Sequence, residues 1–521
     1  MGSLYVLVFC IFGVSTSVAY LNSKPFPPSF KFGVSTSAYQ IEGAWNQGGR
    51  TPSVWDNFIH ENPEKIANND TGDVACDSYN KYEQDVDLLK SMGAQFYRLS
   101  ISWTRILPYG TAQKINQEGV DYYVNLLKLL KENNIEPIVT LYHWDLPMPL
   151  QEMGGWTNPD IIKYFGDYAR ICYKEFGQYV KYWVTLNEPQ TTCFYAYSDN
   201  PPHVHFAPAY SLDAEGTYLC AYTHVKAHAL AYHIYDKEFR EHQQGKISLS
   251  LLARWFEPKP NDPNGELAQE LGMQFQLGLF AHPIYNGNWP QLIIDRVANR
   301  SSMQGLPQSR LPAFTKTEID YINGTYDWFG LNYYITAMVE LQYQEDDLPG
   351  NASYIVDQGF NSYTDSSWKA NKCNSKMVQT PWGFKNLLKW VHDHYNQPEI
   401  IVTENGWCNH ESSLNDTDRI EYVGLHLSAI LDAIYDEGVN VTGYTQWSLL
   451  DNFEWLTGYS AKFGIVSVDF NDENRTRTPR DSFYWYRDVI STRILPNVSS
   501  GAIALQISLF NILVIITLIF I

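Results

Sequence analysis

The stretch Pro398–Trp407 reads PEIIVTENGW and joins a short apolar strand to a polar end. Ile400, Ile401 and Val402 form the β-branched run that a strand covered on both faces requires. Glu404 follows almost directly, and a carboxylate at the end of a buried strand is unfavourable unless it is paired, hydrogen-bonded or used in chemistry. Taken alone, Glu404 is equally consistent with a structural cap or ion pair.

A second stretch, Tyr182–Pro189, has the same design and reads YWVTLNEP. Its apolar strand ends in Asn187 and Glu188, so each of the two strands delivers one glutamate at its C-terminal end. In a closed parallel barrel all such ends open onto one face. Two carboxylates that converge from different strands predict glycoside hydrolysis, in which one is the acid and the other the nucleophile or base.

Strand-like runs recur along the chain, and helical spacing of apolar residues follows them, as in Val120–Lys131. This recurrence predicts an α/β fold, a single-domain (β/α)8 TIM barrel with long βα loops. A doubly wound open sheet is the alternative, and it fits the even recurrence less well. The predicted strands are Phe30–Ser37, Phe96–Ser102, Glu136–Tyr142, Tyr182–Leu186, Lys246–Leu252, Trp328–Tyr334, Glu399–Thr403 and Val441–Trp447. The polar stretch Gln342–Lys376 is predicted to be a loop.

Polar and aromatic residues gather in or after the C-terminal ends of these strands. Each has a structural explanation when taken singly, because a lone histidine, a buried arginine or a tryptophan is usually part of the core. Their joint occurrence at one end of successive strands predicts a site. They are Gln40, Glu42, Arg98, His143, Trp144, Asn187, Glu188, Asn332, Tyr334, Glu404, Trp447, Glu454 and Trp455.

The composition narrows the class of partner. The chain has 521 residues, a formal net charge of −20 and no dense run of lysine or arginine. Nucleic acids and anionic membranes favour basic patches, so we exclude both as main partners and expect a small-molecule substrate. Glycine-rich phosphate loops, HExxH zinc motifs and CxxC pairs do not occur in the sequence, and we predict neither a cofactor nor a metal. The oligomeric state is not predicted.

Both ends of the chain carry apolar segments. Residues 1–19 resemble a secretory signal peptide, with small residues at Ser17–Ala19 before a cleavage point. The apolar run Ile503–Ile521 follows several small residues, which favours a GPI-anchor signal over the alternative, a transmembrane helix. We therefore expect a signal peptide at 1–19, a barrel at 20–496, an anchor segment at 497–521 and a membrane-attached protein that faces outward.

The cysteines and glycosylation sequons agree with export. Eight N-x-S/T sequons occur, beginning at Asn69 and ending at Asn497. If Cys10 leaves with the signal, the cysteines that remain are scattered in a way that fits no metal site. One or more disulfides are expected outside the cytosol, with their connectivity open. These cysteines are Cys76, Cys172, Cys193, Cys220, Cys373 and Cys408.

The sequence resembles glycoside hydrolase family 1, the family of β-glucosidases and lactase-phlorizin hydrolase, and especially its insect members. The resemblance covers Phe30 to about Trp485 with the family's motifs in the family's order. The motifs are FKFGVSTSAYQIEGAW at Phe30–Trp45, YRLSISWTRILP at Tyr97–Pro108, TLYHWDLP at Thr140–Pro147, TLNEP at Thr185–Pro189, GLNYY at Gly330–Tyr334, IVTENG at Ile401–Gly406 and WSLLDNFEW at Trp447–Trp455.

This resemblance implies a retaining mechanism in which Glu188 is the general acid/base and Glu404 is the nucleophile. Arg98 and Tyr334 match the residues that support the nucleophile. Glu188 must begin protonated, and the charge of a nearby Glu404 is expected to raise its pKa. We assign substrate binding to Gln40, His143, Trp144, Asn187, Asn332, Tyr334, Trp447, Glu454 and Trp455.

The implied activity is that of a β-glucosidase that also accepts galactosides or fucosides. Glu454 is expected to repel a 6-phosphosugar. A myrosinase-type thioglucosidase is one alternative, although it must bind a sulfate and no lysine or arginine lies between Glu188 and Tyr210. A non-catalytic, klotho-like co-receptor is another, although such proteins typically lose a catalytic carboxylate and both are present here.

Overall fold

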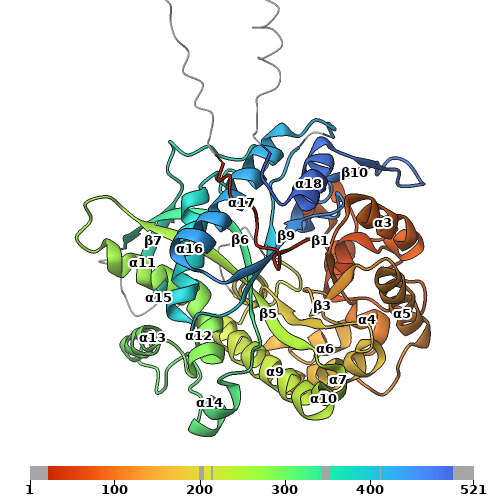
Figure 1. Cartoon of the computed structure of the whole chain (residues 1–521). Coiled ribbons are helices and arrows are strands. Elements are labelled where there is room, and N and C mark those ends of the chain that lie inside the picture. The colour runs from red at the N-terminus through yellow and green to blue at the C-terminus, as the bar shows by residue number, and fades with distance from the viewer. Residues whose placement is uncertain (1–20, 199–204, 213–214, 343–352, 411, 497–521) are drawn as a thin grey trace, which may run out of the picture.

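A closed ring of parallel strands forms the centre of the protein, and helices surround it (Figure 1). This computed structural model describes residues 21–198, 205–212, 215–342, 353–410 and 412–496. In sheet order the ring runs β5 (Lys246–Pro258), β4 (Tyr182–Asn187), β3 (Glu136–Tyr142), β2 (Phe96–Ser100), β1 (Lys31–Ser35), β9 (Val441–Trp447), β8 (Ile400–Asn405) and β6 (Phe329–Leu341). Parallel pairing of β5 with β6 closes the ring. The predicted (β/α)8 barrel is confirmed, since an open doubly wound sheet would leave two edge strands.

The barrel strands are covered on both of their faces. Every residue of β2 and every residue of β8 is buried. Inside the ring, side chains from different strands and from the residue before β6 pack into a separate apolar cluster that fills the barrel near its N-terminal end. Two-sided burial removes the alternation of an amphipathic strand. The inner cluster consists of Phe96, Ile138, Val184, Trp328 and Ile401.

Helix α5 (Gln117–Glu132) shows how the outer layer covers the ring. Its buried residues Val120, Tyr123, Leu127 and Leu130 are three or four positions apart, so they form one stripe that faces the strands. This confirms the helix predicted around Val120–Lys131. The other long helices of the outer layer are α3 (Ser78–Met92), α7 (Ile161–Phe176), α9 (Gly216–Glu238), α16 (Pro381–His394), α17 (Thr417–Glu437) and α18 (Asp481–Thr492).

Shorter elements occupy the connections. Between β5 and β6 lie α11 (Gly265–Met273), a π-helical turn η5 (Gln274–Gly278), α12 (Leu279–Asn286), α13 (Gln291–Met303) and α14 (Lys316–Ile322). The remaining short helices are α1 (Ala38–Ile41), α2 (Val54–Glu61), α4 (Trp103–Ile106), α6 (Met148–Glu152), α8 (Pro189–Tyr195) and α10 (Arg240–Gln243). Single turns of 3-10 helix are η1 (Pro63–Lys65), η2 (Ala67–Asn69), η3 (Gly155–Thr157) and η6 (Trp455–Thr457), and β10 (Val466–Val468) pairs with β11 (Arg477–Pro479).

Strands β5 and β6 are longer than the sequence predicts. They stay paired beyond the barrel as far as Pro258 and Val339, and β7 (Phe360–Tyr363) adds to β6 in antiparallel orientation. The prediction of an unstructured loop over Gln342–Lys376 was therefore wrong for β7 and for the helix α15 (Tyr354–Gln358). In β7 only Phe360 is buried, so the segment carries no apolar pattern from which a strand could be recognised.

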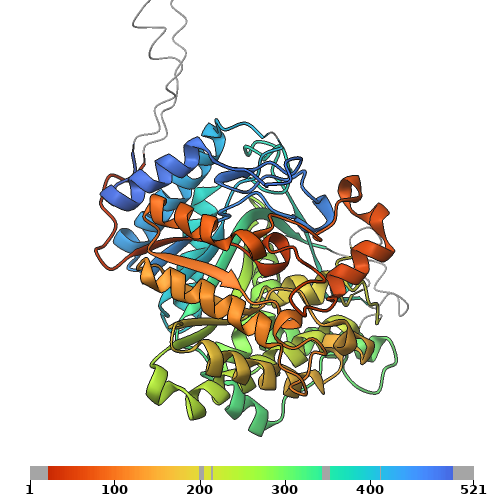
Figure 2. The ribbon, with the colours of Figure 1, turned by 90° about the vertical axis from the view of Figure 1, so that its right-hand side faces the viewer.

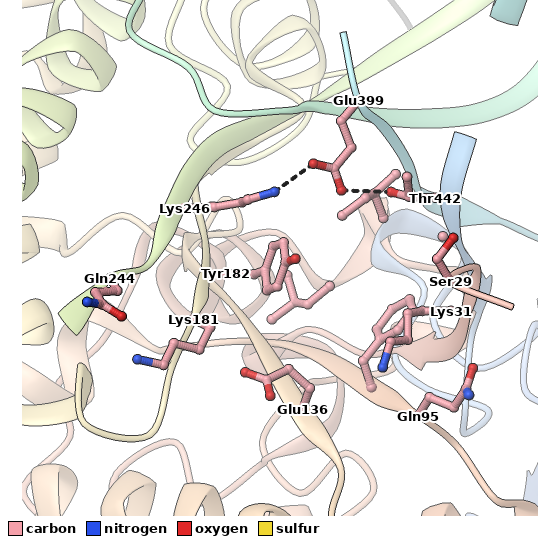
Figure 3. Close-up of a pocket in the computed structure, with 14 residues that line it drawn as sticks. Ser29, Lys31, Gln95, Glu136, Lys181, Tyr182, Gln244, Lys246, Glu399 and Thr442 are labelled. Atoms are coloured by element: carbon pink, nitrogen blue, oxygen red, sulfur yellow. Dashed lines mark hydrogen bonds and ion pairs between the residues drawn. The ribbon is translucent and has the colours of Figure 1, made fainter. Parts of the chain in front are cut away.

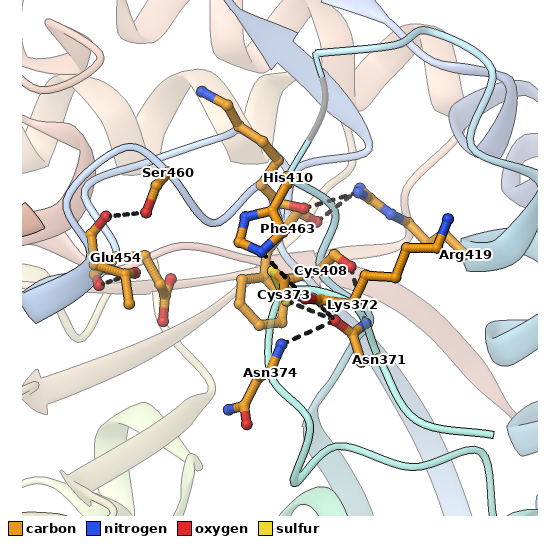
Figure 4. Close-up of a disulfide and its surroundings, with 12 residues drawn as sticks. Asn371, Lys372, Cys373, Asn374, Cys408, His410, Arg419, Glu454, Ser460 and Phe463 are labelled. Carbon is orange, nitrogen blue, oxygen red and sulfur yellow. Dashed lines mark hydrogen bonds between the residues drawn. A yellow bond between two sulfur atoms is a disulfide. The ribbon is translucent and has the colours of Figure 1, made fainter. Parts of the chain in front are cut away.

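Two disulfides resolve the connectivity that the sequence left open. Cys193 is bonded to Cys220, and Cys373 is bonded to Cys408 (Figure 4). Cys76 and Cys172 are buried free thiols, and Cys10 lies outside the described residues. The first bridge joins α8 to α9, and the second joins a loop after β7 to the segment that follows β8.

The two ends of the described chain lie beside each other (Figures 1 and 2). The backbone N–H of Phe26 donates to the carbonyl of Arg493 at 2.8 Å. The predicted signal peptide and the predicted anchor segment lie outside the described residues. Within residues 21–496, as far as they are described, no helix is long and apolar enough to cross a membrane.

Candidate active site

A cavity of about 200 Å³ opens at the C-terminal ends of the barrel strands. Of the thirteen predicted site residues, Glu42 lies elsewhere and three lie directly behind the cavity wall, namely Arg98, Asn187 and Asn332. The remaining nine line the cavity. They are Gln40, His143, Trp144, Glu188, Tyr334, Glu404, Trp447, Glu454 and Trp455. The structure thus brings together side chains from segments that are hundreds of residues apart.

A larger cavity of about 390 Å³ lies at the opposite, N-terminal end of the barrel (Figure 3). Its charged residues include Lys246, whose ammonium group lies 2.7 Å from a carboxylate oxygen of Glu399. Glu136 also lines it, and burial raises the pKa of this carboxyl group. Because barrel chemistry is carried by the C-terminal loops, the smaller cavity is the candidate site.

Glu404 ends β8 in a setting that stabilises a carboxylate anion. One of its oxygens accepts a hydrogen bond from the Arg98 guanidinium, and the other accepts one from the Tyr334 hydroxyl at 3.0 Å. Only 4 % of the residue is exposed, so these interactions are not weakened by bulk water. Arg98 also donates to the Thr403 carbonyl, which holds the guanidinium in place.

Glu188 lies between β4 and α8, and its surroundings are different. Its oxygens accept from neutral groups, the Asn332 side-chain amide and the Thr191 hydroxyl, both at 2.8 Å. Burial, together with the negative charge of Glu404, raises the pKa of Glu188 to about 7. The residue has φ = 42°, a backbone conformation that is uncommon outside glycine and that occurs at functional sites. The surroundings of Glu188 therefore favour its protonated form, whereas Glu404 is paired with a guanidinium.

A hydrogen-bond network connects the two glutamates behind the cavity wall. The second guanidinium nitrogen of Arg98 donates to the Asn187 side-chain oxygen at 2.6 Å. Asn332 donates to that same oxygen at 3.2 Å and accepts from the Thr403 hydroxyl at 2.7 Å. These interlocked contacts restrict the rotamers of the groups that hold both carboxyls.

Gln40 and Glu454 form a polar end of the cavity. The Gln40 amide donates to a carboxyl oxygen of Glu454 at 3.1 Å and to the side chain of Asn452 at 2.9 Å. Burial, followed by the charge of Glu404, raises the pKa of Glu454 to about 8. At neutral pH Glu454 is therefore mostly protonated. It then does not carry the negative charge that was expected to repel a phosphosugar.

Aromatic rings form another wall. Trp144 and Trp455 pack at 4.6 Å between ring centroids, and the His143 ring lies parallel to the Trp447 ring at 6.0 Å. Burial and the Arg98 charge lower the pKa of His143 well below its ordinary value. His143 is therefore neutral, and its Nε2 lies 3.1 Å from the side-chain nitrogen of Asn187.

Glu42 does not belong to the site, although the sequence groups it there. Its carboxylate is buried against Arg105, whose Nε donates at 3.0 Å, so Glu42 is part of a structural ion pair. The only group of three metal-ligating side chains in the described part of the chain is Cys193, Cys220 and His224, and its two sulfurs are already bonded to each other.

A further part of the cavity lies beside Glu188 and was not predicted from the sequence. Its members come from α8, from the extended parts of β5 and β6, and from loops. The charge at Arg254, within the otherwise apolar run Leu251–Phe256 of β5, is the signal that could have identified it. These residues are Thr191, Phe206, Leu252, Arg254, Ile335, Asn374, Met377 and Phe463.

The second disulfide helps to shape this part of the cavity (Figure 4). Asn374 and Met377, which line it, lie in the short loop that begins at Cys373. The bond to Cys408 ties that loop to the segment directly after Glu404, and the Asn371 amide reinforces it by donating to the Cys408 carbonyl at 2.9 Å.

Comparisons with known proteins agree with this geometry. A family model described as glycosyl hydrolase family 1 matches residues 22–494. The chain is 42% identical over 468 residues to myrosinase 1 of Brevicoryne brassicae (90% of this chain, 98% of that protein) and 42% identical over 469 residues to human cytosolic beta-glucosidase (89% and 98%). It is 43% identical over 473 residues to human lactase/phlorizin hydrolase, of whose length it spans 24%. The structure of an aphid myrosinase aligns with a TM-score of 0.85 at 41% identity, covering 90% of this chain and 100% of that one.

Proposed function

The chain belongs to glycosyl hydrolase family 1 and is a retaining β-glycosidase, and from this premise we propose that it removes terminal β-D-glucosyl residues from small glycosides. In this proposal Glu404 is the nucleophile and Glu188 the general acid/base. One observation carries it, namely that two buried carboxyls line one cavity in opposite surroundings. Glu404 is paired with Arg98, whereas the pKa of Glu188 is raised to about 7.

In the first step, the Glu404 carboxylate attacks the anomeric carbon while Glu188 gives its proton to the glycosidic oxygen. The bond to the leaving group breaks and a glycosyl ester forms on Glu404. Arg98 and Tyr334 hold the attacking oxygens in place. Burial and the negative charge of Glu404 raise the pKa of Glu188 to about 7, so Glu188 carries its proton below that pH.

In the second step, water attacks the anomeric carbon of the ester and Glu188 accepts the proton from that water. Esterification has removed the charge of Glu404, so the carboxyl group of Glu188 becomes more acidic and is ready to act as base. Water adds from the face that the leaving group vacated, and the sugar departs with its original β configuration.

Galactosides and fucosides are the additional substrates that we propose, and Gln40 with Glu454 discriminates among them. Gln40→Ala should lower kcat/KM for an aryl β-glucoside by about tenfold or more, because a buried hydrogen-bonding group is left without its partner. Initial rates on glucoside, galactoside and fucoside of the same phenol check this, with the exposed Gln47→Ala as a control expected to match wild type. Equal rates for Gln40→Ala and wild type on all three sugars would remove Gln40 from sugar recognition.

The function is tested by the turnover of an aryl β-glucoside and its loss in Glu404→Gln. A co-receptor of the non-catalytic type would show binding and no turnover in either protein. A myrosinase-type thioglucosidase is the second candidate, favoured by the similarity to myrosinase 1 of Brevicoryne brassicae. Comparison of kcat/KM for a thioglucoside and an O-glucoside separates these two activities.

We also propose that the protein passes through the secretory pathway and is held at the cell surface by a GPI anchor. The two disulfides support an oxidising compartment, since such bonds are rare in the cytosol. We expect a phosphatidylinositol-specific phospholipase to release β-glucosidase activity from membranes of cells that express the full chain. Activity that remains on the membrane after this treatment and leaves it only with detergent would indicate a transmembrane helix instead.

A further inference from the structure

Arg254 lies on β5 at the rim of the active-site cavity. Of the lysines and arginines in the described part of the chain, it alone lines that cavity. The cavity is otherwise lined by neutral groups and by the carboxyls of Glu188, Glu404 and Glu454. An arginine beside three carboxyls would ordinarily be explained as their counter-charge, so its actual partners decide its role.

The β5–β6 ladder is irregular at Arg254. Ala253 pairs with Tyr333 and Trp255 pairs with Thr336, so Arg254 alone lies opposite two residues of β6. Bulges of this kind change the direction of a side chain and are frequent next to active sites. The extra residue of the bulge belongs to β6. The backbone N–H of Arg254 donates to the Gln276 side-chain oxygen at 3.1 Å, which holds Arg254 in place opposite the bulge.

The guanidinium of Arg254 has few partners within the protein. Its Nη2 donates to the Tyr195 hydroxyl at 3.2 Å, and its Nε is buried without a hydrogen-bond partner. Among the described residues, no carboxylate forms an ion pair with it. Arg98, Arg105 and Arg480 show the contrasting pattern, since each is buried against its own glutamate or aspartate.

The position of Arg254 relative to Glu188 identifies which part of a substrate it would meet. Tyr195, its hydrogen-bond partner, lies on α8, the helix that begins directly after Glu188. Glu188 protonates the oxygen of the departing group, so that group must lie on the Glu188 side of the cavity. Arg254 therefore belongs to the space for the leaving group and not to the pocket formed by Gln40 and Glu454.

A second cavity, of about 250 Å³, continues from the same arginine. Arg254 lines both cavities, and the second one has an aromatic wall that includes Phe194, Tyr195, Phe256 and Tyr354. A leaving group larger than a single ring would pass the guanidinium and continue over this aromatic surface. The junction therefore offers two adjacent features, a planar cation with free donors and an apolar surface.

We propose that Arg254 binds an anionic group on the leaving group, so that the enzyme prefers β-glycosides of acidic aglycones. This inference rests on the proposed glycosidase function. A guanidinium presents a rigid fork of donors that matches a planar or tetrahedral oxyanion, and bonds between charged groups are about twice as strong as neutral ones. A buried donor without a partner is unfavourable, and an anionic aglycone would relieve this by accepting from the guanidinium. A neutral aglycone would not, so the enzyme would select against it.

The test compares two substrates that differ in one charge, 4-carboxyphenyl β-D-glucoside and its methyl ester. For wild type we expect a higher kcat/KM on the acid than on the ester. Arg254→Gln should lower the ratio of the two by about tenfold or more, as expected for the loss of a charge-assisted hydrogen bond. Arg254→Lys should keep part of the preference. Added salt should weaken the preference in wild type and in Arg254→Lys, but should have little effect on the ratio in Arg254→Gln.

Lys259→Gln is the matched control, because it removes one positive charge from the same strand's exposed end, where Lys259 pairs with Glu340. It should leave the ratio at the wild-type value. A fall in the ratio as large as that of Arg254→Gln would show a general charge effect and overturn the proposal. So would an unchanged ratio in Arg254→Gln.

Binding separates this inference from the proposed function. Titration calorimetry of Glu404→Gln with the acid and the ester measures recognition without turnover. If wild type hydrolyses neither compound, the proposed function fails. The role of Arg254 would still be supported if Glu404→Gln binds the acid at least tenfold more tightly than the ester and the double variant Glu404→Gln/Arg254→Gln loses this difference. Equal binding of acid and ester would reject it. A sulfated thioglucoside in the same titration tells a sulfate-bearing aglycone from a carboxylate-bearing one.

Discussion

Glu404→Gln is expected to lower kcat for aryl β-glucosides by at least about 10⁴-fold, the scale seen when a covalent catalyst loses its nucleophile. An amide of the same shape can occupy the position at the end of β8, but it cannot attack the anomeric carbon and form the glycosyl ester. Sugar binding should persist, because the contacts of Gln40 and Glu454 are untouched. Rates on an activated aryl glucoside, together with calorimetric titration of the same compound, measure the two effects separately.

Arg98 adds a second expected consequence. In wild type its guanidinium is buried against Glu404, and the variant leaves that positive charge without its anionic partner. Breaking a buried pair on one side costs about 3–5 kcal/mol in other proteins. The thermal midpoint of Glu404→Gln should therefore fall, and a loss of kcat counts as chemical only where the variant still binds the glucoside.

Glu399→Gln is the matched control for this experiment. Glu399 directly precedes the same strand, but it lies at the opposite end of the barrel and pairs with Lys246 (Figure 3). Its loss should leave kcat within a factor of about two, since a partly exposed pair is worth at most about 1 kcal/mol. Full activity in Glu404→Gln, or equal losses in both variants, would contradict the role given to Glu404.

The sequence was sufficient to predict the barrel because the relevant signals are local. Each predicted strand is a short run rich in β-branched or aromatic residues, and the polar residues at its end follow within a few positions, as Glu404 follows Val402. Barrel closure then brings those ends together without further information, so twelve of the thirteen predicted residues line one cavity or lie directly behind its wall.

The features that the sequence did not reveal depend on contacts between distant segments. The disulfide from Cys373 to Cys408 requires the loop after β7 to lie beside the end of β8, and no spacing of cysteines encodes this. In the sequence alone, Arg254 looks like the polar end of an apolar strand. Its place in the cavity depends on β6, which lies beside β5 with a bulge opposite Arg254. The strand extensions and the space for the leaving group are therefore built by the segments that connect the barrel strands. The conformation of such segments is less restricted than that of the barrel itself.

Glu188→Gln is expected to slow the hydrolysis of glucosides with poor leaving groups by about 10²–10⁴-fold, the usual contribution of general acid catalysis. The effect on 2,4-dinitrophenyl β-glucoside should be much smaller in the first step, because that phenolate departs without a proton. Single-turnover rates for a series of phenols give the dependence on leaving-group acidity, which should be steeper in the variant. Equal losses across the series would count against the acid role.

The pH dependence provides an independent test of the same residue. Glu188 must carry a proton in the first step, and burial beside Glu404 raises its pKa to about 7. In wild type kcat/KM should therefore fall as pH rises through about 7, and Glu188→Gln should lose that alkaline limb because glutamine does not titrate. Glu136→Gln is the control. Burial raises the pKa of Glu136 as well, but this carboxyl lines the cavity at the far end of the barrel, so its loss should leave the profile unchanged.

The small variant Glu188→Ala tests the second step. Without the carboxyl no base activates water, so the glycosyl ester on Glu404 should accumulate with an activated substrate. Azide needs no base and fits the space left by the side chain, so it should restore turnover and give β-glucosyl azide with retained configuration. An α-glucosyl azide would mean a single displacement in which azide takes the place of the missing nucleophile. Glu188 would then be the nucleophile and Glu404 the acid/base, so the roles of the two glutamates would have to be reversed.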